Sequence, residues 1–262
     1  MNIRLEGKRA LVCGSSQGIG KAAALELAAL GAEVILMARN EGALKKVLKM
    51  LDGSKPVQHQ YLLADFSNPE QVEEQINGFI DKDNPIHILI NNTGGPPGGQ
   101  AIDASPGAFL NALKSHLICN QLLTKALVPG MRQSGYGRIV NIISTSVKVP
   151  IPGLGVSNTV RGAVASWAKT LATELGPDGI TVNNVLPGFT STPRLTEVFS
   201  SQAEQKGISL ETHVQAMKAS VPLKRFADTS ETAAAIAFLA SPAASYINGI
   251  NLPVDGGRTP CL

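Results

Sequence analysis

The chain has few cysteines and no long apolar run. Its 262 residues include three cysteines, Cys13, Cys119 and Cys261, which form no CxxC or other metal-ligand spacing. This usage favours reduced thiols in a cytosolic protein over a metal site or a disulfide framework. No apolar run approaches the ~18 residues of a membrane-spanning helix, so no membrane association is expected.

The sequence also lacks a concentration of charge of one sign and a secretory signal. Lys and Arg number 23 against 20 Asp and Glu, a net charge of +3, and the basic residues are scattered. This excess is too small to indicate nucleic-acid binding. Glu6, Lys8 and Arg9 interrupt the apolar stretch that a signal peptide needs. With 44% hydrophobic and 16% charged residues, the composition predicts a sizeable core and little disorder.

Short β-rich runs alternate with helical patterns along almost the whole chain. The predicted strands are 9–14, 32–38, 59–65, 86–92, 137–144, 179–188 and 248–257. The predicted helices lie between them, at 20–31, 41–51, 68–80, about 107–131, 157–175 and 228–241. Strands that alternate with crossover helices predict a single doubly wound α/β domain over residues 1–262, with about seven parallel strands and helices on both faces.

One stretch departs from this alternation. Residues 189–225 are polar and less regular, so we expect an irregular segment that serves as a substrate lid. Its apolar residues Leu195, Val198 and Phe199 would suit either a partly apolar substrate or a neighbouring subunit.

A glycine-rich turn, GSSQGIG, follows the first predicted strand. A strand, such a turn and a helix together present backbone N–H groups and the positive end of the helix to a phosphate. Glycine is needed where a Cβ would block the pyrophosphate or the strand–helix contact, although an ordinary tight turn is the alternative. The predicted dinucleotide-binding residues are Gly14, Ser15, Ser16, Gln17, Gly18, Ile19 and Gly20.

The glycine spacing resembles the GxxxGxG loop of the short-chain dehydrogenase/reductase family, and further motifs of that family follow in order. NNTG at 91–94 resembles its NNAG motif, and IVNIIS at 139–144 resembles the strand that ends at its catalytic serine. LPGFTST at 186–192 resembles its Pro-Gly turn over the nicotinamide, and NLPVDGG at 251–257 resembles its C-terminal strand. The resemblance covers almost the entire chain. It implies a Rossmann-type oxidoreductase similar to the 3-oxoacyl-carrier-protein reductases.

The resemblance implies a nicotinamide cofactor, and the end of the second predicted strand favours NADP(H) over NAD(H). An acidic residue there would bind both ribose hydroxyls and repel a 2′-phosphate. This chain has Ala38 and then Arg39, whose guanidinium would attract the phosphate, unless Arg39 is only a solvated residue at a helix start. Asp65 would contact the adenine, or is instead a turn or capping residue. The resemblance assigns to the cofactor Asp65, Phe66, Asn91, Gly94, Arg161, Pro187, Gly188 and Thr192.

The family uses Asn, Ser, Tyr and Lys in catalysis, and this chain keeps only the serine. Ser144 ends the fifth predicted strand. At the tyrosine and lysine positions, which lie four residues apart on one helix face, the sequence has Ser157 and Arg161. The asparagine position falls on His116. The expected catalytic residues are therefore Ser144, Ser157, Arg161 and His116, and no metal is expected.

These replacements change which groups can transfer a proton. A phenol has a pKa of ~10, and a serine hydroxyl is much less acidic, so Ser157 is a poor general acid. Arg161 stays protonated, and can bind ribose hydroxyls or polarise a carbonyl. His116, with an unperturbed pKa of ~6.5, is the candidate proton donor. The alternatives are a buried helix residue for His116 and a helix cap for Ser157.

The loop that follows the fourth predicted strand, NNTGGPPGGQAI at 91–102, is longer and richer in Gly and Pro than a simple turn needs. In this fold it borders the substrate crevice. Its N–H groups around Gly94 and Gly95 would help to stabilise an oxyanion, or the loop is simply a rigid turn.

The sequence leaves two functions open. The first is NADP(H)-dependent reduction of a small-molecule carbonyl or enone, in which Ser144 and Arg161 polarise the oxygen and His116 or water gives the proton. The second is a catalytically impaired protein that binds or senses NADP(H). The resemblance also implies a cytoplasmic homo-oligomer, a tetramer that pairs the helices at 107–131 and 157–175, with no nucleic-acid or membrane partner.

Overall fold

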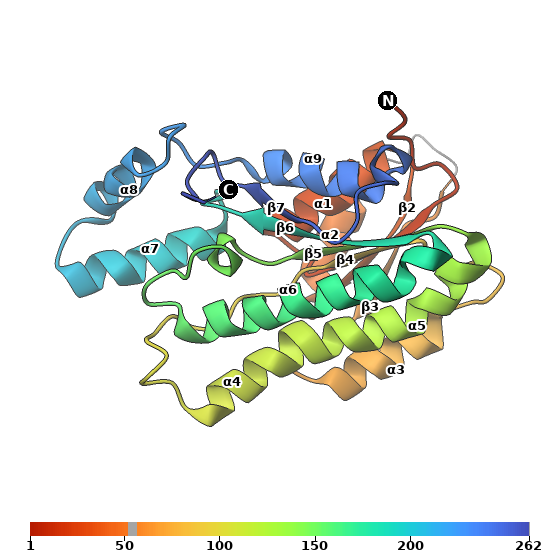
Figure 1. The fold of residues 1–262 in the computed structure, drawn as a ribbon, viewed down its shortest axis with the longest axis horizontal. Coiled ribbons are helices and arrows are strands. Elements are labelled where there is room, and N and C mark those ends of the chain that lie inside the picture. Colours follow the sequence, from red (N-terminus) through yellow and green to blue (C-terminus); the bar gives the residue numbers. More distant parts are fainter. Residues whose placement is uncertain (52–56, 262) are drawn as a thin grey trace.

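The protein folds around one parallel β-sheet, as the computed structural model shows for residues 1–51 and 57–261 (Figure 1). In these residues seven strands are hydrogen-bonded in the order β3-β2-β1-β4-β5-β6-β7, and every neighbouring pair is parallel. The strands are β1 (Arg9–Cys13), β2 (Glu33–Ala38), β3 (Gln60–Leu63), β4 (Ile88–Asn91), β5 (Gly137–Ile142), β6 (Ile180–Pro187) and β7 (Asn251–Val254).

Helices cover both faces of the sheet, which confirms the predicted doubly wound α/β domain. The core on one face is closed by α1, α2 and α9, and the core on the other by α3, α5 and α6 (Figure 1). Residues 52–56 and 262, which the predicted domain includes, lie outside the described residues. The helices are α1 (Gly18–Ala29), α2 (Glu41–Leu48), α3 (Pro69–Phe79), α4 (Pro106–Leu113), α5 (Cys119–Ser134), α6 (Gly155–Leu175), α7 (Pro193–Lys206), α8 (Leu210–Ala219) and α9 (Thr229–Ala240).

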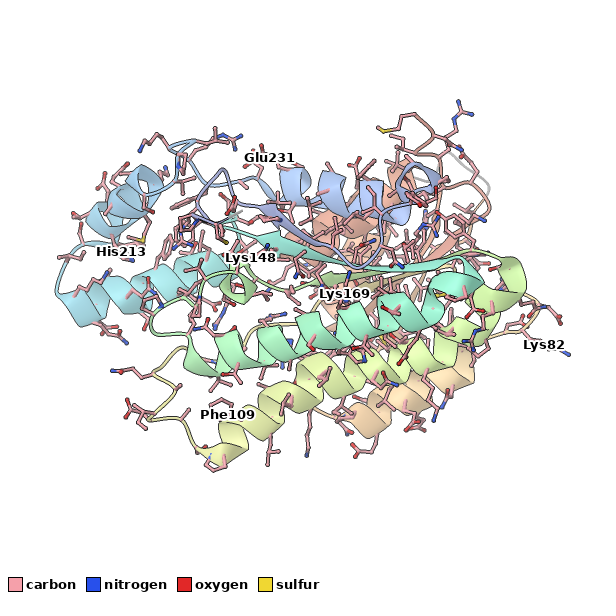
Figure 2. All side chains as sticks on the ribbon, in the orientation of Figure 1. Lys82, Phe109, Lys148, Lys169, His213 and Glu231 are labelled. Carbon is pink, nitrogen blue, oxygen red and sulfur yellow. The ribbon has the colours of Figure 1, made fainter. Side chains whose placement is uncertain are left out.

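The central strands are mostly apolar, as expected where both faces of a sheet are covered. Every residue of β1 and β5 is buried, and Figure 2 shows side chains filling the space between sheet and helices on both sides. On one face α1 and α9 are rich in alanine, and Ala23, Ala24 and Ala237 are buried there. Such small side chains let two helices lie close together. No helix in the described part of the chain is long and apolar enough to cross a membrane.

The prediction of an irregular segment over 189–225 is wrong, because this segment contains α7 and α8. Both helices have strong local signals. The Thr192 side chain caps α7, Gly207 ends it in the left-handed conformation, and the Ser209 side chain caps α8. The two helices project beyond the sheet (Figure 1), so only a few of their side chains are buried, and the polar sequence reflects this exposure.

The helix predicted at about 107–131 is interrupted. Between α4 and α5 one turn of π-helix spans Lys114–Ile118, and the chain runs through it without a loop. A π-turn takes one residue more than the i→i−4 pattern and is most often found at functional sites. It bears His116.

A row of asparagine side chains crosses the sheet from β4 to β7. Asn91, Asn141, Asn184 and Asn251 are register partners on adjacent strands. The Nδ2 of Asn91 donates to Asn141 Oδ1 at 2.8 Å, Asn141 Nδ2 to Asn184 Oδ1 at 2.9 Å, and Asn184 Nδ2 to Asn251 Oδ1 at 2.8 Å. Each amide in the middle of this asparagine row both donates and accepts, so the row fixes the register of four strands.

We expect Asn141→Leu to lower the free energy of unfolding by about 2–4 kcal/mol, because it removes two hydrogen bonds and leaves buried amide groups on both neighbours unpaired. Asn251→Ala at the partly exposed end of the row should cost about 1 kcal/mol, since water can replace the lost partner. Urea unfolding of both variants measures the two losses. Equal losses would show that the row does not act as a buried network.

Candidate active site

A cleft of about 590 Å³ lies at the carboxyl ends of the strands. The strand order reverses between β1 and β4, and such a switch point is where ligands bind in open α/β sheets. Most of the predicted site residues converge on this cleft. Those that line it are Gly14, Ser16, Gln17, Gly18, Ile19, Arg39, Asp65, Phe66, Gly94, Ser144, Ser157, Arg161, Pro187, Gly188 and Thr192.

Four predicted residues lie behind the cleft wall. Ser15 is buried, and its Oγ accepts a hydrogen bond from the Met37 N–H at 3.0 Å. Gly20 packs where a Cβ would lie 2.3 Å from the Gly14 carbonyl oxygen, so it serves the strand–helix contact. Asn91 is buried with its side chain in the asparagine row and is not among the residues that line the cleft, so its contact with the ribose stays a prediction. The fourth residue, His116, is described below.

At one end of the cleft the glycine turn presents the start of α1. The N-cap residue Gln17 makes no side-chain capping bond, and the first turn of α1 has no acidic residue. Asn92 holds the turn by donating from Nδ2 to the carbonyl oxygens of Cys13 and Gly14, each at 3.3 Å. The N–H groups at the start of a helix need acceptors, and a phosphate satisfies them. This end therefore fits the pyrophosphate of a dinucleotide.

Arg39 stands at the outer rim beside Asp65. Its Nη1 lies 3.9 Å from Asp65 Oδ2, and its side chain is 79% exposed. An exposed pair at this distance contributes little, so the guanidinium is available to a ligand. Asp65 also forms a turn, because its Oδ1 accepts from the N–H and the hydroxyl of Ser67, both at 2.9 Å, and these bonds lower the pKa of Asp65. Asp65 is thus both a turn residue and part of the cleft wall.

Ser144, Ser157 and Arg161 line the part of the cleft at the carboxyl end of β5, which is called the inner cleft from here on. Ser144 follows β5, and its Oγ accepts from the Ser146 N–H at 3.1 Å, which leaves its own hydroxyl proton free for a ligand. Leu154 is the N-cap of α6, so Ser157 is not the cap but lies inside the first turn. Arg161 follows one turn later on the same face.

The carboxyl end of β5 fixes the position of the Arg161 guanidinium. Its Nη1 donates to the Ile142 carbonyl oxygen at 2.9 Å, and the residue is 8% exposed. Burial lowers the pKa of Arg161 to about 10, so the side chain still carries its positive charge at neutral pH. A fixed cation therefore lines the cleft together with Ser144 and Ser157.

His116 does not reach the cleft and does not titrate near neutrality. It lies on the π-turn, is 3% exposed, and its Nδ1 is hydrogen-bonded to the Thr93 hydroxyl. Burial, and then the charge of Arg161, lowers its pKa to about 3. The expectation of an imidazole with a pKa near 6.5 is therefore wrong, because sequence spacing does not show desolvation. His116 instead holds Thr93, which does line the cleft.

Several cleft residues were missed from the sequence. Asn92 was detectable as the second asparagine of NNTG, and Thr93 as the residue after it. Arg194 follows Pro193 in α7, which was predicted to be irregular, so its position at the cleft was not foreseen. The further residues that line the cleft are Ala38, Ala64, Ser67, Ser115, Ile142, Ile143 and Pro193. Gly95, which the sequence placed beside the substrate crevice, lines the cleft as well.

A second cavity of about 630 Å³ adjoins the cleft between α7 and α8. The two share Thr192 and Pro193 as lining residues. Leu195 and Phe199 line the second cavity, and Phe199 is packed edge-on against Phe189. Of the three apolar residues named from the sequence, Leu195 and Phe199 therefore line this cavity and Val198 does not.

We expect acid to destabilise the fold through His116. Its pKa is about 3 in the folded chain and ~6.5 when unfolded, so the unfolded state binds the extra proton between these values and stability falls as pH falls below ~6.5. Between about pH 7 and about pH 5 this group alone costs about 2 kcal/mol. Urea midpoints measured across that range should fall less in His116→Asn than in the unaltered protein. His87, whose pKa is also lowered, to about 4, remains in both. Equal slopes would contradict the assignment.

The chain is similar to known reductases over nearly its whole length. A family model described as enoyl-(acyl carrier protein) reductase matches residues 14–259. The 3-oxoacyl-acyl-carrier-protein reductase of Vibrio cholerae is 34% identical over 256 residues, which are 97% of this chain and 98% of the relative. The corresponding reductase of Haemophilus influenzae is 35% identical over 254 residues, again 97% of this chain and 98% of the relative.

Solved structures have the same fold. L-sorbose reductase from Gluconobacter frateurii, complexed with NADPH and L-sorbose, superposes with a TM-score of 0.92 at 30% identity and covers 100% of both chains. YwfH, described as an NADPH-dependent reductase involved in bacilysin biosynthesis, superposes with a TM-score of 0.91 at 27% identity over 97% of this chain and 99% of its own. With these matches, the ordered motifs and the sheet order, the chain belongs to the short-chain dehydrogenase/reductase family of oxidoreductases.

Proposed function

We propose that this protein is an NADP(H)-dependent reductase of a small-molecule carbonyl compound or enone. The observation that carries this proposal is one continuous cleft with a phosphate-binding turn at one end and Ser144, Ser157 and Arg161 at the other. Similar proteins of known structure, L-sorbose reductase and actinorhodin polyketide ketoreductase, contain NADPH. The resemblance to 3-oxoacyl-acyl-carrier-protein reductases supports the same class of reaction.

The residues present fit this cofactor. A Cβ on Gly14 would lie 2.5 Å from the Asn92 carbonyl oxygen, so the glycine turn is held close to β4 with its amides toward the cleft. Arg39 supplies a cation directly after β2, at the position where a carboxylate would repel a 2′-phosphate. Thr192 and Pro187 would border the nicotinamide end, as the family pattern implies.

The reaction requires a hydride, a stabilised oxygen and a proton. When bound, NADP(H) supplies the hydride that reduces the substrate carbon and is itself oxidised. Ser144 and Ser157 donate hydrogen bonds to the oxygen on which charge develops, and Arg161 stabilises that charge. The proton that completes the reduction comes from water in the cleft, since Arg161 stays protonated and His116 is a buried positioning residue behind Thr93.

The missing phenol bears on the choice of substrate. General acid catalysis is worth ~10²–10⁴ in rate, so a site without Tyr is poorly suited to protonate an alkoxide in step with hydride transfer. In an enone the hydride joins carbon, and the oxygen needs only stabilisation before the carbon is protonated. We therefore favour conjugate reduction over ketone reduction.

The Arg39 assignment predicts a change in cofactor preference. Arg39→Ala should weaken NADPH binding by about 10–100-fold, because a charge-assisted pair with the 2′-phosphate is lost. NADH affinity in the same variant is the internal control and should change little. Calorimetry with both cofactors measures the ratio. A parallel loss of both affinities would contradict the 2′-phosphate contact.

Ser144 separates an enzyme from a protein that only binds or senses NADP(H). We expect NADPH oxidation with a panel of enones and ketones, and a fall in kcat of about 10–100-fold in Ser144→Ala with cofactor affinity retained. Nicotinamide absorbance gives the rate, and calorimetry gives the affinity. Tight NADPH binding without turnover on the whole panel would favour the sensing function instead.

We further propose a cytoplasmic homotetramer. The proposal rests on the family resemblance, because subunits in this family commonly pair through the helices that correspond to α5 and α6. Exposed apolar residues on this side, Leu110 and Ile118, are consistent with it. The free thiols, of which Cys13 and Cys119 are buried, suit a reducing compartment.

A further inference from the structure

The inner cleft holds a buried cation with no carboxylate to balance it. Arg161 forms no ion pair within the described chain, and burial is what shifts its pKa, with no acidic group contributing. Among the residues that line the cleft, Asp65 alone is acidic, and it pairs with Arg39 at the outer rim. His116 is neutral, so it neither adds to the charge of Arg161 nor balances it.

Most of the hydrogen-bonding capacity of Arg161 is also unused. A guanidinium has five N–H donors, and the structure assigns one bond, from Nη1 to the Ile142 carbonyl oxygen. Nη2 lies toward Gly95, 3.9 Å from where a Cβ on that glycine would be. The ribose hydroxyls that the resemblance assigns to Arg161 would supply acceptors but no negative charge. A buried charge is costly unless it is paired and hydrogen-bonded, so the site is completed by a ligand that brings negative charge as well as acceptors.

A second arginine borders the same loop. Arg194 Nη2 donates to the Pro96 carbonyl oxygen at 3.0 Å, so the loop residues Gly95 and Pro96 are flanked by Arg161 on one side and Arg194 on the other. Arg194 is partly balanced by Glu197, at 3.4 Å on the exposed surface of α7. Two positive charges therefore line this part of the cleft: the buried charge of Arg161 and the half-exposed charge of Arg194.

We propose that the substrate carries a carboxylate group and that Arg161 binds it. The ligand class is an unsaturated or oxo acid, which deepens the proposed reductase function and rests on it. The planar fork of a guanidinium matches the two oxygens of a carboxylate. In an unsaturated acid the carboxylate is itself the conjugated group, so Arg161 binds it and stabilises the charge that develops on it. In an oxo acid Ser144 and Ser157 bind the oxo oxygen beside the carboxylate. The permanent charge of Arg161 makes it a specificity residue, because it stabilises the bound acid before any reaction begins.

The test is the affinity for matched acidic and neutral compounds in the complex with NADP+. Cinnamate is compared with cinnamamide, and phenylpyruvate with its methyl ester, by calorimetry. Each acid should bind at least ~10-fold more tightly than its neutral partner. Arg161→Gln and Arg161→Met should both remove this preference, whereas Arg132→Gln, a surface arginine paired with Asp178, should retain it.

Equal binding of acid and neutral partner, binding of neither, or a preference that persists in the Arg161 variants would each overturn the proposal. The comparison on the unaltered protein stands even if a variant fails to fold, which thermal unfolding shows. The titrations are repeated without cofactor. An acid preference in a protein that takes up no NADP(H) would preserve the carboxylate site while removing the reductase function, and NADP(H) binding without acid preference would do the reverse.

Discussion

The close approach of Asn92 to the glycine turn is the constraint on which the site depends. Asn92 leaves β4 beside the turn that leaves β1, and its amide donates to two carbonyl oxygens of that turn. A Cβ on Gly14 or Gly20 would lie within 2.7 Å of an Asn92 atom, so both positions require glycine. This packing brings the start of α1 to the strand ends and makes the switch point between β1 and β4 a phosphate site.

The asparagine row and Arg161 are both buried polar groups, and they differ in how far they are hydrogen-bonded. In the asparagine row three hydrogen bonds join amides on neighbouring strands, and Asn91 Oδ1, at the end of the row, is the buried atom of the row left without a partner in the described chain. At Arg161 the opposite holds, since a full charge is buried against a single carbonyl oxygen. A satisfied network stabilises the fold, whereas an unsatisfied charge is tolerated where a ligand completes it. The contrast separates the scaffold of this protein from its site.

At the positions where the family resemblance implies Tyr and Lys, the cleft is lined by Ser157 and Arg161. Ser144 keeps its place after β5, and the two replacements share a helix face that still points to it. The residues present differ from the family pattern in which group could donate a proton and in the charge that lies beside Ser144. Arg161 carries a positive charge that it does not give up, and His116 is too deeply buried to exchange protons near neutral pH. The remaining groups stabilise an oxygen better than they protonate one.

From the sequence alone came the alternation of strands and helices, the single parallel sheet, the glycine turn and the positions of Ser144, Ser157 and Arg161. These depend on local patterns and on ordered motifs, which a linear chain displays directly. Only the tertiary structure decided that 189–225 contains two helices, that the Asn91 side chain joins the asparagine row, that His116 stays neutral and that Arg161 has no counter-ion among the described residues. Each of these depends on which side chains from distant segments surround a group. Those neighbours decide whether the group is exposed to solvent and which partners it has, and spacing along the chain reveals neither.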